Sequence, residues 1–301
     1  MTGSRAGELH TAVTSRLRAA GCVFAEEEAA LLLEAVGRDV PPGSERAAHA
    51  TSRSAAHVPI DAEGRLEGLV ARRVAGEPLE HVLGWVAFAG RRWAVAPGVF
   101  VPRQRSALLV DLALAAVRPT MSAVRSTTSA VVVDLCCGTG ALGGAVAAAL
   151  RDDGAAVELH AADLDPAATA CAAENLAPFG GAVHTGDLYA ALPPGLRGRV
   201  DLLLCHAPYV PTAAIALLPP EAREHEPLTA LDGGPDGLEV LRRAIGEATA
   251  WLAPGGTLLF ELGDERQRTT AQALLAREGL RATVHEDDET GATVVTATAA
   301  R

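Results

Sequence analysis

The chain has 301 residues, 49% of them hydrophobic and only 3% aromatic, so alanine, valine and leucine must fill most of its core. Its formal net charge of −11 counts against binding of bare nucleic acid, because that affinity comes from neutralising phosphates. No apolar run approaches the roughly 20 residues of a membrane span, and the five cysteines form no CxxC pair. We therefore expect a cytoplasmic protein with no membrane attachment, no disulfide framework and no metal site.

Residues 1–80 are predicted to form a separate helical domain. Leu9, Val13 and Leu17 share one helical face, and a helix over 26–36 opens with three acids that suit its positive N-terminal end. Residues 43–62 show little periodicity and are predicted to be loop or weak helix, before helical spacing resumes over 66–75. This domain is either a structural cap or a domain that docks the substrate.

Residues 81–103 are predicted to form a β-hairpin linker. Two apolar and aromatic segments flank Gly90, and Pro97-Gly98 and Pro102 punctuate the exit from the hairpin. A helix is expected over 106–117, followed by a Ser- and Thr-rich surface connection over 118–129. The second domain is predicted to occupy 104–301.

From residue 130 the pattern alternates strands and helices, which is typical of an open α/β sheet. Seven strands are predicted, over 130–136, 157–163, 182–186, 200–206, 256–262, 281–287 and 292–299. The last two are joined only by Asp288–Gly291, which is too short for a parallel crossover, so they should pair antiparallel. The pattern predicts a Rossmann-like α/β fold.

The first of these strands ends in a glycine-rich turn that predicts a nucleotide-type ligand. Asp134 closes a β-branched run, and Gly138 and Gly140 follow before an alanine-rich helix. Glycines allow close approach of the backbone, and the free N–H groups of a helix start supply donors. The turn also fits a dinucleotide fingerprint that ends at Gly143, because Asp163 lies 20 residues further on.

Asp134 favours S-adenosylmethionine (AdoMet) over a dinucleotide or a ligand-free turn. A carboxylate there repels pyrophosphate but suits a ligand that carries sulfonium and ammonium groups. Asp163 would then accept hydrogen bonds from the ribose hydroxyls, with Leu164 beside it. Asp165 precedes a proline and fits a helix N-cap. Cys136 is expected to be a small packing residue of the turn.

Two further strand ends carry candidate residues. After the third strand, Asp187 would bond the adenine amino group and Leu188 would pack on the ring, although an ordinary polar turn is the alternative. The fourth strand runs into His-Ala-Pro-Tyr over 206–209. This is the edge at which ligands bind in open α/β sheets.

These motifs resemble the HemK family of protein-glutamine N5-methyltransferases, which methylate the glutamine of a Gly-Gly-Gln motif in peptide-chain release factors. The resemblance covers nearly the whole chain, including the hairpin segment 76–103, the glycine turn, Asp163 and a long, specific segment over 225–238. It is closest to a branch of unknown substrate. It implies AdoMet as cofactor and S-adenosylhomocysteine as product.

The resemblance also implies roles for single residues. AdoMet would be bound by Asp134, Cys136, Gly138, Gly140, Asp163, Leu164, Asp187, Leu188 and His206. The catalytic residues would be His206, Pro208 and Tyr209. The substrate would contact Arg103, Ala207, Pro208, Tyr209 and Glu226.

His206 departs from the family pattern, which has Asn-Pro-Pro-Tyr, or Asn-Ala-Pro-Tyr in the narrower branch. In the family, the Asn oxygen and a proline carbonyl accept the two amide hydrogens and aim the nitrogen at the methyl group. A neutral histidine accepts through one ring nitrogen, whereas a protonated one cannot, so activity could be pH-gated. Three outcomes stay open: His206 replaces Asn as acceptor, acts as a base on an amine, or abolishes transfer.

A second departure follows Pro102-Arg103, where the family has Pro-Glu-Thr-Glu and this chain has Gln104-Arg105-Ser106. The family's acids are absent there and Arg105 is added. Arg103 itself is expected either to contact the substrate or to form a salt bridge with a nearby acid.

The sequence thus predicts an AdoMet-dependent N-methyltransferase that acts on a glutamine amide of a protein such as a release factor, docked by the N-terminal domain. One alternative is a small-molecule amine or amide N-methyltransferase with an altered acceptor site. A non-catalytic AdoMet-binding protein, a nucleic-acid N-methyltransferase and a nicotinamide dehydrogenase are the others.

Overall fold

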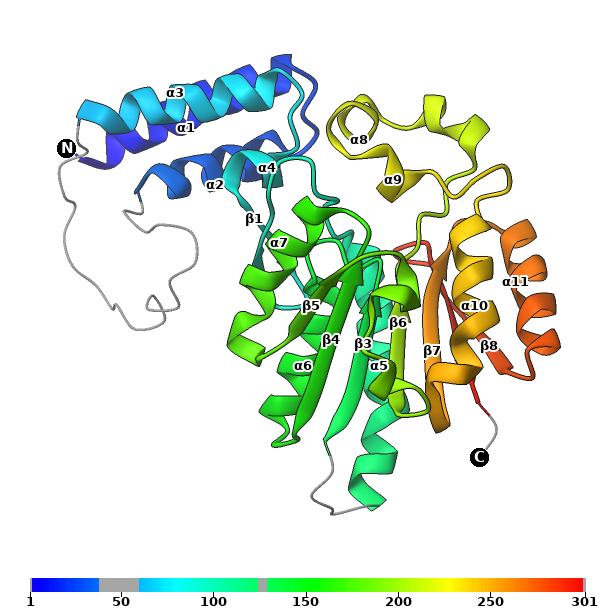
Figure 1. Cartoon of the computed structure of the whole chain (residues 1–301). Coiled ribbons are helices and arrows are strands. Elements are labelled where there is room, and N and C mark those ends of the chain that lie inside the picture. The colour runs from blue at the N-terminus through cyan, green and yellow to red at the C-terminus, as the bar shows by residue number, and fades with distance from the viewer. Residues whose placement is uncertain (1, 38–59, 124–128, 300–301) are drawn as a thin grey trace. The chain divides into compact units, whose positions relative to one another are not determined.

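The computed structural model describes residues 2–37, 60–123 and 129–299 (Figure 1). The chain divides into two compact units, one of Met1–Trp85 with Pro219–His225 and the other of Val86–Leu218 with Glu226–Arg301. Residues 219–225 therefore belong with the N-terminal helices, although they lie far along the chain. Nothing in their sequence indicated this.

The N-terminal unit consists of helices that pack around one small apolar core. They are α1 (Thr2–Ala19), α2 (Ala25–Gly37), α3 (Ile60–Val74), α4 (Leu79–Leu83) and α8 (Pro220–His225). Val13 and Leu17 lie in the core, as their helical spacing predicts. The predicted loop over 43–62 falls mostly outside the described residues, and its last three residues already belong to α3.

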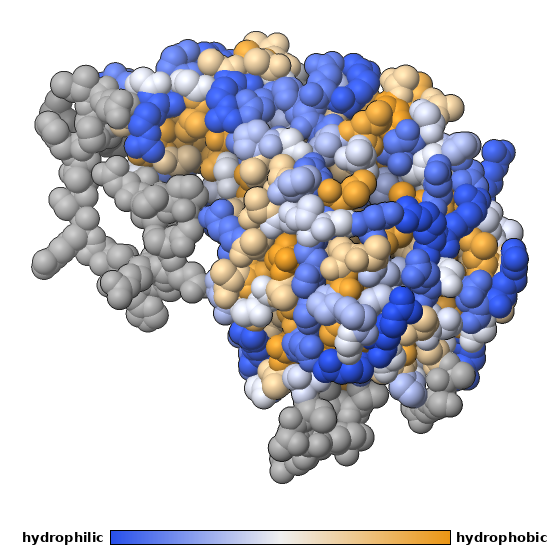
Figure 2. Space-filling view, in the orientation of Figure 1, coloured by the Kyte–Doolittle hydropathy of each residue, from blue (hydrophilic) through white to orange (hydrophobic). Residues whose placement is uncertain are grey.

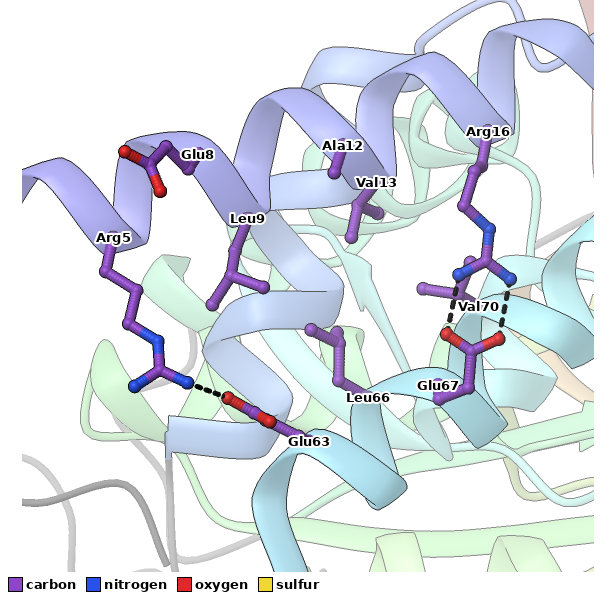
Figure 3. A pocket seen from close by; sticks show the side chains of 10 residues that line it. All are labelled: Arg5, Glu8, Leu9, Ala12, Val13, Arg16, Glu63, Leu66, Glu67 and Val70. Atoms are coloured by element: carbon purple, nitrogen blue, oxygen red, sulfur yellow. Dashed lines mark hydrogen bonds and ion pairs between the residues drawn. The ribbon is translucent and has the colours of Figure 1, made fainter. Parts of the chain in front are cut away.

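A buried arginine ties α8 to the other helices of this unit. Arg73 of α3 donates from Nε to Glu28 Oε2 of α2 at 2.7 Å, and its Nη1 lies 3.3 Å from Glu221 Oε1 of α8. One cation thus joins three helices. Elsewhere in the unit, a groove of about 470 Å³ runs between α1 and α3 (Figure 3). Apolar side chains form its floor, and the ion pairs Arg5–Glu63 and Arg16–Glu67 bridge its two helices.

The predicted hairpin is formed by β1 (Trp85–Phe88) and β2 (Arg91–Ala94). Its two-residue turn has positive φ at both Ala89 (47°) and Gly90 (73°), which is the turn geometry that matches the twist of paired strands. A 3-10 turn, η1 (Gln104–Ser106), then leads into α5 (Ala107–Ala123). The prediction of a connection from residue 118 was wrong up to Ala123, because α5 continues to that residue even though its sequence includes Pro119.

The second unit contains a seven-stranded sheet in the order β5-β4-β3-β6-β7-β9-β8. The strands are β3 (Ala130–Leu135), β4 (Val157–Asp163), β5 (Ala182–Thr185), β6 (Val200–Cys205), β7 (Leu252–Leu262), β8 (Arg281–Asp287) and β9 (Ala292–Thr298). The first five in this spatial order run parallel, and β9 pairs antiparallel with both β7 and β8. The Rossmann-like fold and the antiparallel final hairpin are confirmed.

Strand β7 begins four residues before its predicted start, at Leu252. Leu252 pairs with Val200, and a register shift then separates this pair from the regular ladder that starts at Leu202 and Thr257. Gly256 lies in the shifted segment, where a Cβ would approach the Val200 carbonyl oxygen to 2.4 Å. The glycine that looked like a strand start therefore permits a close crossing inside the strand.

Two helical layers cover the sheet, because successive strand residues point to opposite faces. Val132 packs in the cluster that contains α5, α6 (Ala141–Asp152) and α7 (Pro166–Leu176). Val133 packs in the cluster that contains α10 (Glu239–Trp251) and α11 (Glu265–Arg277). The remaining short elements are η2 (Ala177–Phe179), η3 (Leu188–Ala191), η4 (Pro194–Leu196), η5 (Thr212–Leu217) and α9 (Leu228–Leu231).

On the face shown in Figure 2, hydrophilic and apolar residues are interspersed. Among the described residues, no helix combines the length and the apolar character that a bilayer crossing requires. The site is positioned by β3, where the strand order changes direction: the chain continues from β3 to β4 on one side, and β6 lies on the other side. Loops that leave β3 and β6 at such a point diverge and leave a crevice between them.

Candidate active site

The predicted ligand residues follow the carboxyl ends of adjacent parallel strands. Asp163 ends β4, and the Gly186 N–H that precedes Asp187 donates to the Asp163 carbonyl at 2.9 Å. On the other side of β3, the His206 N–H donates to the Leu135 carbonyl at 3.2 Å. The sheet thus brings the glycine turn, Asp163, Asp187 and the His-Ala-Pro-Tyr turn to one edge.

Asp134 is a fully buried carboxyl group beneath the start of α6. Its Oδ2 accepts the Gly143 N–H at 2.8 Å, whereas its Oδ1 has no hydrogen-bond partner among the described residues. Burial raises the pKa of Asp134 to about 7, the charge of Asp163 adds to this, and the Gly143 N–H opposes it. An unpartnered buried oxygen of this kind is satisfied by a cationic ligand.

The glycine turn has the backbone that its sequence requires. Gly138 and Gly140 have φ of 53° and 74°, and Gly140 is the N-cap of α6. Gly143 cannot carry a side chain without a shift of its neighbour, because a Cβ would lie 2.9 Å from Asp134 Oδ2. Cys136 also has a positive φ, 54°, and its side chain is partly buried. The turn is therefore bent tightly over the acid.

Asp163 has acceptor capacity left for a ligand. Its Oδ2 accepts the Gly138 N–H at 2.9 Å and its Oδ1 the Asp165 N–H at 3.0 Å. The Leu164 N–H also interacts with this carboxylate, so only part of its capacity of about four acceptor sites stays open. Leu164, beside it, is 62% exposed. Asp165 caps α7 by accepting the Ala167 N–H at 2.8 Å, as the Asp-Pro pattern indicates. An acid with free lone pairs thus lies next to exposed apolar surface.

Asp187 lies between β5 and η3, and Leu188 is the first residue of η3. Arg243 Nη2 of α10 donates to Asp187 Oδ2 at 2.6 Å, so one carboxylate oxygen is already paired. Leu188 is buried, with φ of 45°. Arg243 is a partner that the sequence did not suggest.

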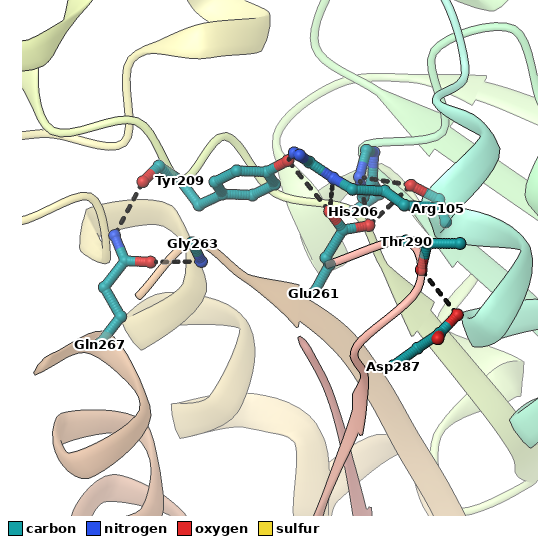
Figure 4. A network of polar contacts seen from close by, with 9 residues as sticks. Arg105, His206, Tyr209, Glu261, Gly263, Gln267, Asp287 and Thr290 are labelled. Atoms are coloured by element: carbon teal, nitrogen blue, oxygen red, sulfur yellow. Dashed lines mark hydrogen bonds and ion pairs between the residues drawn. The ribbon is translucent and has the colours of Figure 1, made fainter. Parts of the chain in front are cut away.

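His206 faces a buried carboxylate. Its Nε2 lies 3.5 Å from Glu261 Oε2 of β7 and 3.5 Å from Ser106 Oγ. Ser106 Oγ donates to the same Glu261 oxygen at 2.6 Å. The imidazole also packs against the Phe100 ring, with 5.5 Å between ring centroids. The side chain that replaces the family's Asn is therefore part of a polar network (Figure 4).

Glu261 is the centre of this network, and its side chain is only 1% exposed. Arg105 Nε donates to Glu261 Oε1 at 2.7 Å, and Tyr209 Oη donates to the same oxygen at 3.0 Å. Burial opposes ionisation of Glu261, but the hydrogen bond and the charge of His206, the hydrogen bond from Ser106 and the charge of Arg105 outweigh it and lower its pKa to about 2. Glu261 is therefore an ionised acceptor at neutral pH.

Tyr209 stays protonated and has a fixed position. Burial and the Glu261 charge raise the pKa of Tyr209 to about 12, although Arg105 opposes them. Gln267 Nε2 donates to the Tyr209 carbonyl at 2.7 Å, and Gln267 Oε1 accepts the Gly263 N–H at 2.8 Å (Figure 4). This amide binds the His-Ala-Pro-Tyr turn to the end of β7. Ala207, within the turn, is buried.

Arg103 and Glu226, both predicted to contact the substrate, contact each other. Arg103 Nη2 donates to Glu226 Oε2 at 2.6 Å, and Glu226 Oε1 accepts the Val101 N–H at 3.3 Å. The Arg103 guanidinium also lies 4.8 Å above the centre of the Phe100 ring. This is the salt bridge that the sequence offered as the alternative for Arg103.

The sequence missed Glu261 and Gln267 as site residues and gave no role to Arg105 and Ser106. One signal was available for Glu261, since it closes the apolar run 258–260 as Asp134 closes its own strand. Gln267 carries no such signal, because its role is to hold backbone groups.

Comparison with known proteins identifies the family. The chain is 38% identical over 280 residues to the release factor glutamine methyltransferase of Deinococcus radiodurans, covering 93% of both chains. The chain belongs to the release factor glutamine methyltransferase family. A member from Cereibacter sphaeroides is 36% identical over 89% of this chain and 88% of its own length. The Methyltransferase small domain family matches residues 96–217.

Structural comparison agrees on the fold. The hMettl16 catalytic domain superposes with a TM-score of 0.53 at 13% identity, covering 79% of this chain and 81% of its own. Family membership makes this chain an AdoMet-dependent methyltransferase. The residues fit that cofactor, because Asp134 Oδ1 has no hydrogen-bond partner in the part of the chain that the structure describes, Asp163 keeps some acceptor capacity and Leu164 offers apolar surface.

Proposed function

We propose that this chain methylates the side-chain amide nitrogen of a glutamine in a protein, and that this protein is a peptide-chain release factor. The relative of 38% identity over 93% of both chains supports this proposal. The observation that carries it is the His-Ala-Pro-Tyr turn, because the His206–Leu135 backbone hydrogen bond fixes this turn beside the glycine turn.

The AdoMet site is assigned to the residues at the carboxyl ends of β3, β4 and β5. Asp134 faces the cationic part of the ligand, and Asp163 accepts hydrogen bonds from its ribose hydroxyls. Leu164 and Leu188 pack on the adenine, and Asp187 accepts from its amino group through the oxygen that Arg243 leaves free. Gly138, Gly140 and Cys136 form the backbone wall.

The acceptor glutamine is assigned to the turn over 206–209. His206 and the Pro208 carbonyl accept its two amide hydrogens, Tyr209 packs beside it, and Ala207 keeps the wall small. Arg103 and Glu226 are placed at the substrate side as one paired unit. AdoMet, when bound, supplies a methyl group from a sulfonium. The chain contributes by positioning the amide nitrogen against the methyl group, which converts a random encounter into a near-attack geometry.

The N-terminal unit is proposed to dock the acceptor protein. Its groove between α1 and α3 combines an apolar floor with charged rims. An apolar centre with a polar rim is the anatomy of protein–protein interfaces.

The experiment is methyl transfer to a release factor purified from cells that lack this gene. We expect one methyl group on the glutamine of the Gly-Gly-Gln motif, located by tandem mass spectrometry. A release factor with that glutamine replaced by alanine is the matched control and should gain none. Binding of AdoMet without transfer to the release factor would overturn the proposal, and transfer to free amines would favour the small-molecule alternative.

A further inference from the structure

Both departures from the family pattern meet at Glu261. Ser106 and Arg105 come from the altered stretch after Arg103, and His206 comes from the altered start of the acceptor turn. These stretches are about 100 residues apart in sequence, yet all three side chains contact the Glu261 carboxylate. Substitutions that converge on one buried charge indicate one coupled change in the chemistry of the site.

The hydrogen-bond donors around His206 can be counted completely. A serine hydroxyl has one proton, and Ser106 donates it to Glu261 at 2.6 Å. Ser106 and Glu261 can therefore only accept from His206 Nε2, so this nitrogen carries the proton in the neutral ring. No hydrogen bond to His206 Nδ1 is found among the described residues. Nδ1 is then the ring nitrogen with a free lone pair.

We propose that Glu261 and Ser106 hold neutral His206 in the Nε2–H tautomer, so that Nδ1 accepts the proton of the substrate nitrogen during methyl transfer. This inference rests on the proposed function. His206 acts as the catalytic base, and Glu261 and Ser106 are positioning residues. An asparagine oxygen accepts a hydrogen bond but is not basic, so this chain adds a proton acceptor to the family's site.

The charges around His206 favour its role as a base. The groups that face it are Glu261 from β7, Ser106 and Arg105 from η1, and Tyr209 from its own turn. Tyr209 is neutral, and the Arg105 guanidinium is bonded to Glu261 and Tyr209. At 3.5 Å the Nε2–Glu261 contact is at the outer limit of a hydrogen bond. It can shorten when the imidazole becomes charged.

Atoms and electrons balance in the transfer step. AdoMet, when bound, supplies a methyl group whose former bonding pair stays on sulfur, giving a neutral thioether. The lone pair of the substrate nitrogen forms the new carbon–nitrogen bond. The N–H proton passes to His206 Nδ1 and gives an imidazolium, whose positive charge faces the Glu261 carboxylate. Release of that proton to water restores the neutral ring.

The first test is independent of turnover. Two-bond ¹H–¹⁵N correlations of ¹⁵N-histidine-labelled protein distinguish the ring nitrogens, and His206→Asn identifies the signal of His206 among the nine histidines. We expect Nε2 protonated in the wild type. In Ser106→Ala and Glu261→Gln the tautomer ratio should fall about fivefold, which corresponds to one hydrogen bond of about 1 kcal/mol. Glu28→Gln, which alters a buried carboxylate in the N-terminal unit, is the control and should leave the signal unchanged. A wild-type ring protonated on Nδ1 would overturn the proposal.

The second test measures kcat/KM against pH. The wild-type profile should have an acid limb that the profile of His206→Asn lacks, because only the wild type carries a base at this position. In a protein that keeps His206, Glu261→Gln should lower kcat/KM at least about fivefold, the factor by which the tautomer ratio falls. In the His206→Asn background the same change should cost less than about threefold. Equal losses in both backgrounds would mean that Glu261 is only structural. If no acceptor is methylated at all, the proposed function fails, and the tautomer measurement still decides this inference.

Discussion

Replacing Asp134 with asparagine should change how the stability of the ligand-free protein depends on pH. The native pKa of Asp134 is raised by burial to about 7 from an ordinary value of 3.8. The folded protein therefore keeps this proton to a higher pH than the unfolded chain does. The free energy of unfolding must fall as the pH rises from about 4 to about 7, and the full penalty is present above pH 7.

The magnitude follows from the two pKa values. For a native value of about 7 and an unfolded value of 3.8, the penalty is roughly 1.5 kcal/mol at pH 5 and roughly 4 kcal/mol at pH 8. Asparagine has no proton to lose and carries no such penalty. The difference in free energy of unfolding, variant minus wild type, should therefore increase by about 2.5 kcal/mol between these pH values. Any pH-independent cost of the substitution cancels.

Urea unfolding of both proteins at pH 5, 6, 7 and 8 without AdoMet measures this difference. Asp288→Asn, in the exposed turn between β8 and β9, should give a flat difference and is the matched control. A difference for Asp134→Asn that stays within about 0.5 kcal/mol over the whole range would refute the reasoning, because it would mean that Asp134 is ionised in the folded protein at pH 5. In the wild type, AdoMet should bind more tightly at pH 8 than at pH 6, since its cationic groups favour the carboxylate.

Four further substitutions test packing and binding. Gly144→Ala would place a Cβ 2.5 Å from the buried Trp93 ring and should lower the free energy of unfolding by about 2 kcal/mol. Gly246→Ala, which has open space around it in α10, should raise the free energy of unfolding by about 0.5–1 kcal/mol. Equal effects of the two substitutions in urea titrations would contradict this reasoning. Asn175→Ala removes hydrogen bonds of 2.8, 2.8 and 2.9 Å that join β2 to the glycine turn, and thermal unfolding should show a loss of about 2–3 kcal/mol. Asp163→Ala should weaken binding of S-adenosylhomocysteine at least about tenfold by calorimetry, as expected for a lost pair of hydrogen bonds, and unchanged affinity would remove Asp163 from the site.

The sheet was predictable from sequence because strand periodicity is a local property. Six of the seven strands begin at the predicted residue, and the seventh was misplaced only because Gly256 resembles a strand boundary. The glycine turn was equally predictable, since a positive φ at Gly138 and Gly140 is a property of single residues. Their ligand roles are still predictions.

The surroundings of His206 were not predictable. Arg105 and Glu261 are 156 residues apart, and only the packing of η1 against β7 brings them together. The sequence marked Arg105 and His206 as unusual separately, but no local pattern says that two unusual residues share one carboxylate. The same limit applies to Gln267, whose partners are backbone groups that every residue possesses.

The discontinuity of the N-terminal unit has a practical consequence for dissecting this protein. The polypeptide passes from one unit to the other three times, at residues 85/86, 218/219 and 225/226. A fragment that stopped at Trp85 would lack α8 and would leave Arg73 with Glu28 as its one remaining carboxylate. Expression of the N-terminal helices by themselves would therefore require residues 219–225 to be fused to them through an artificial linker.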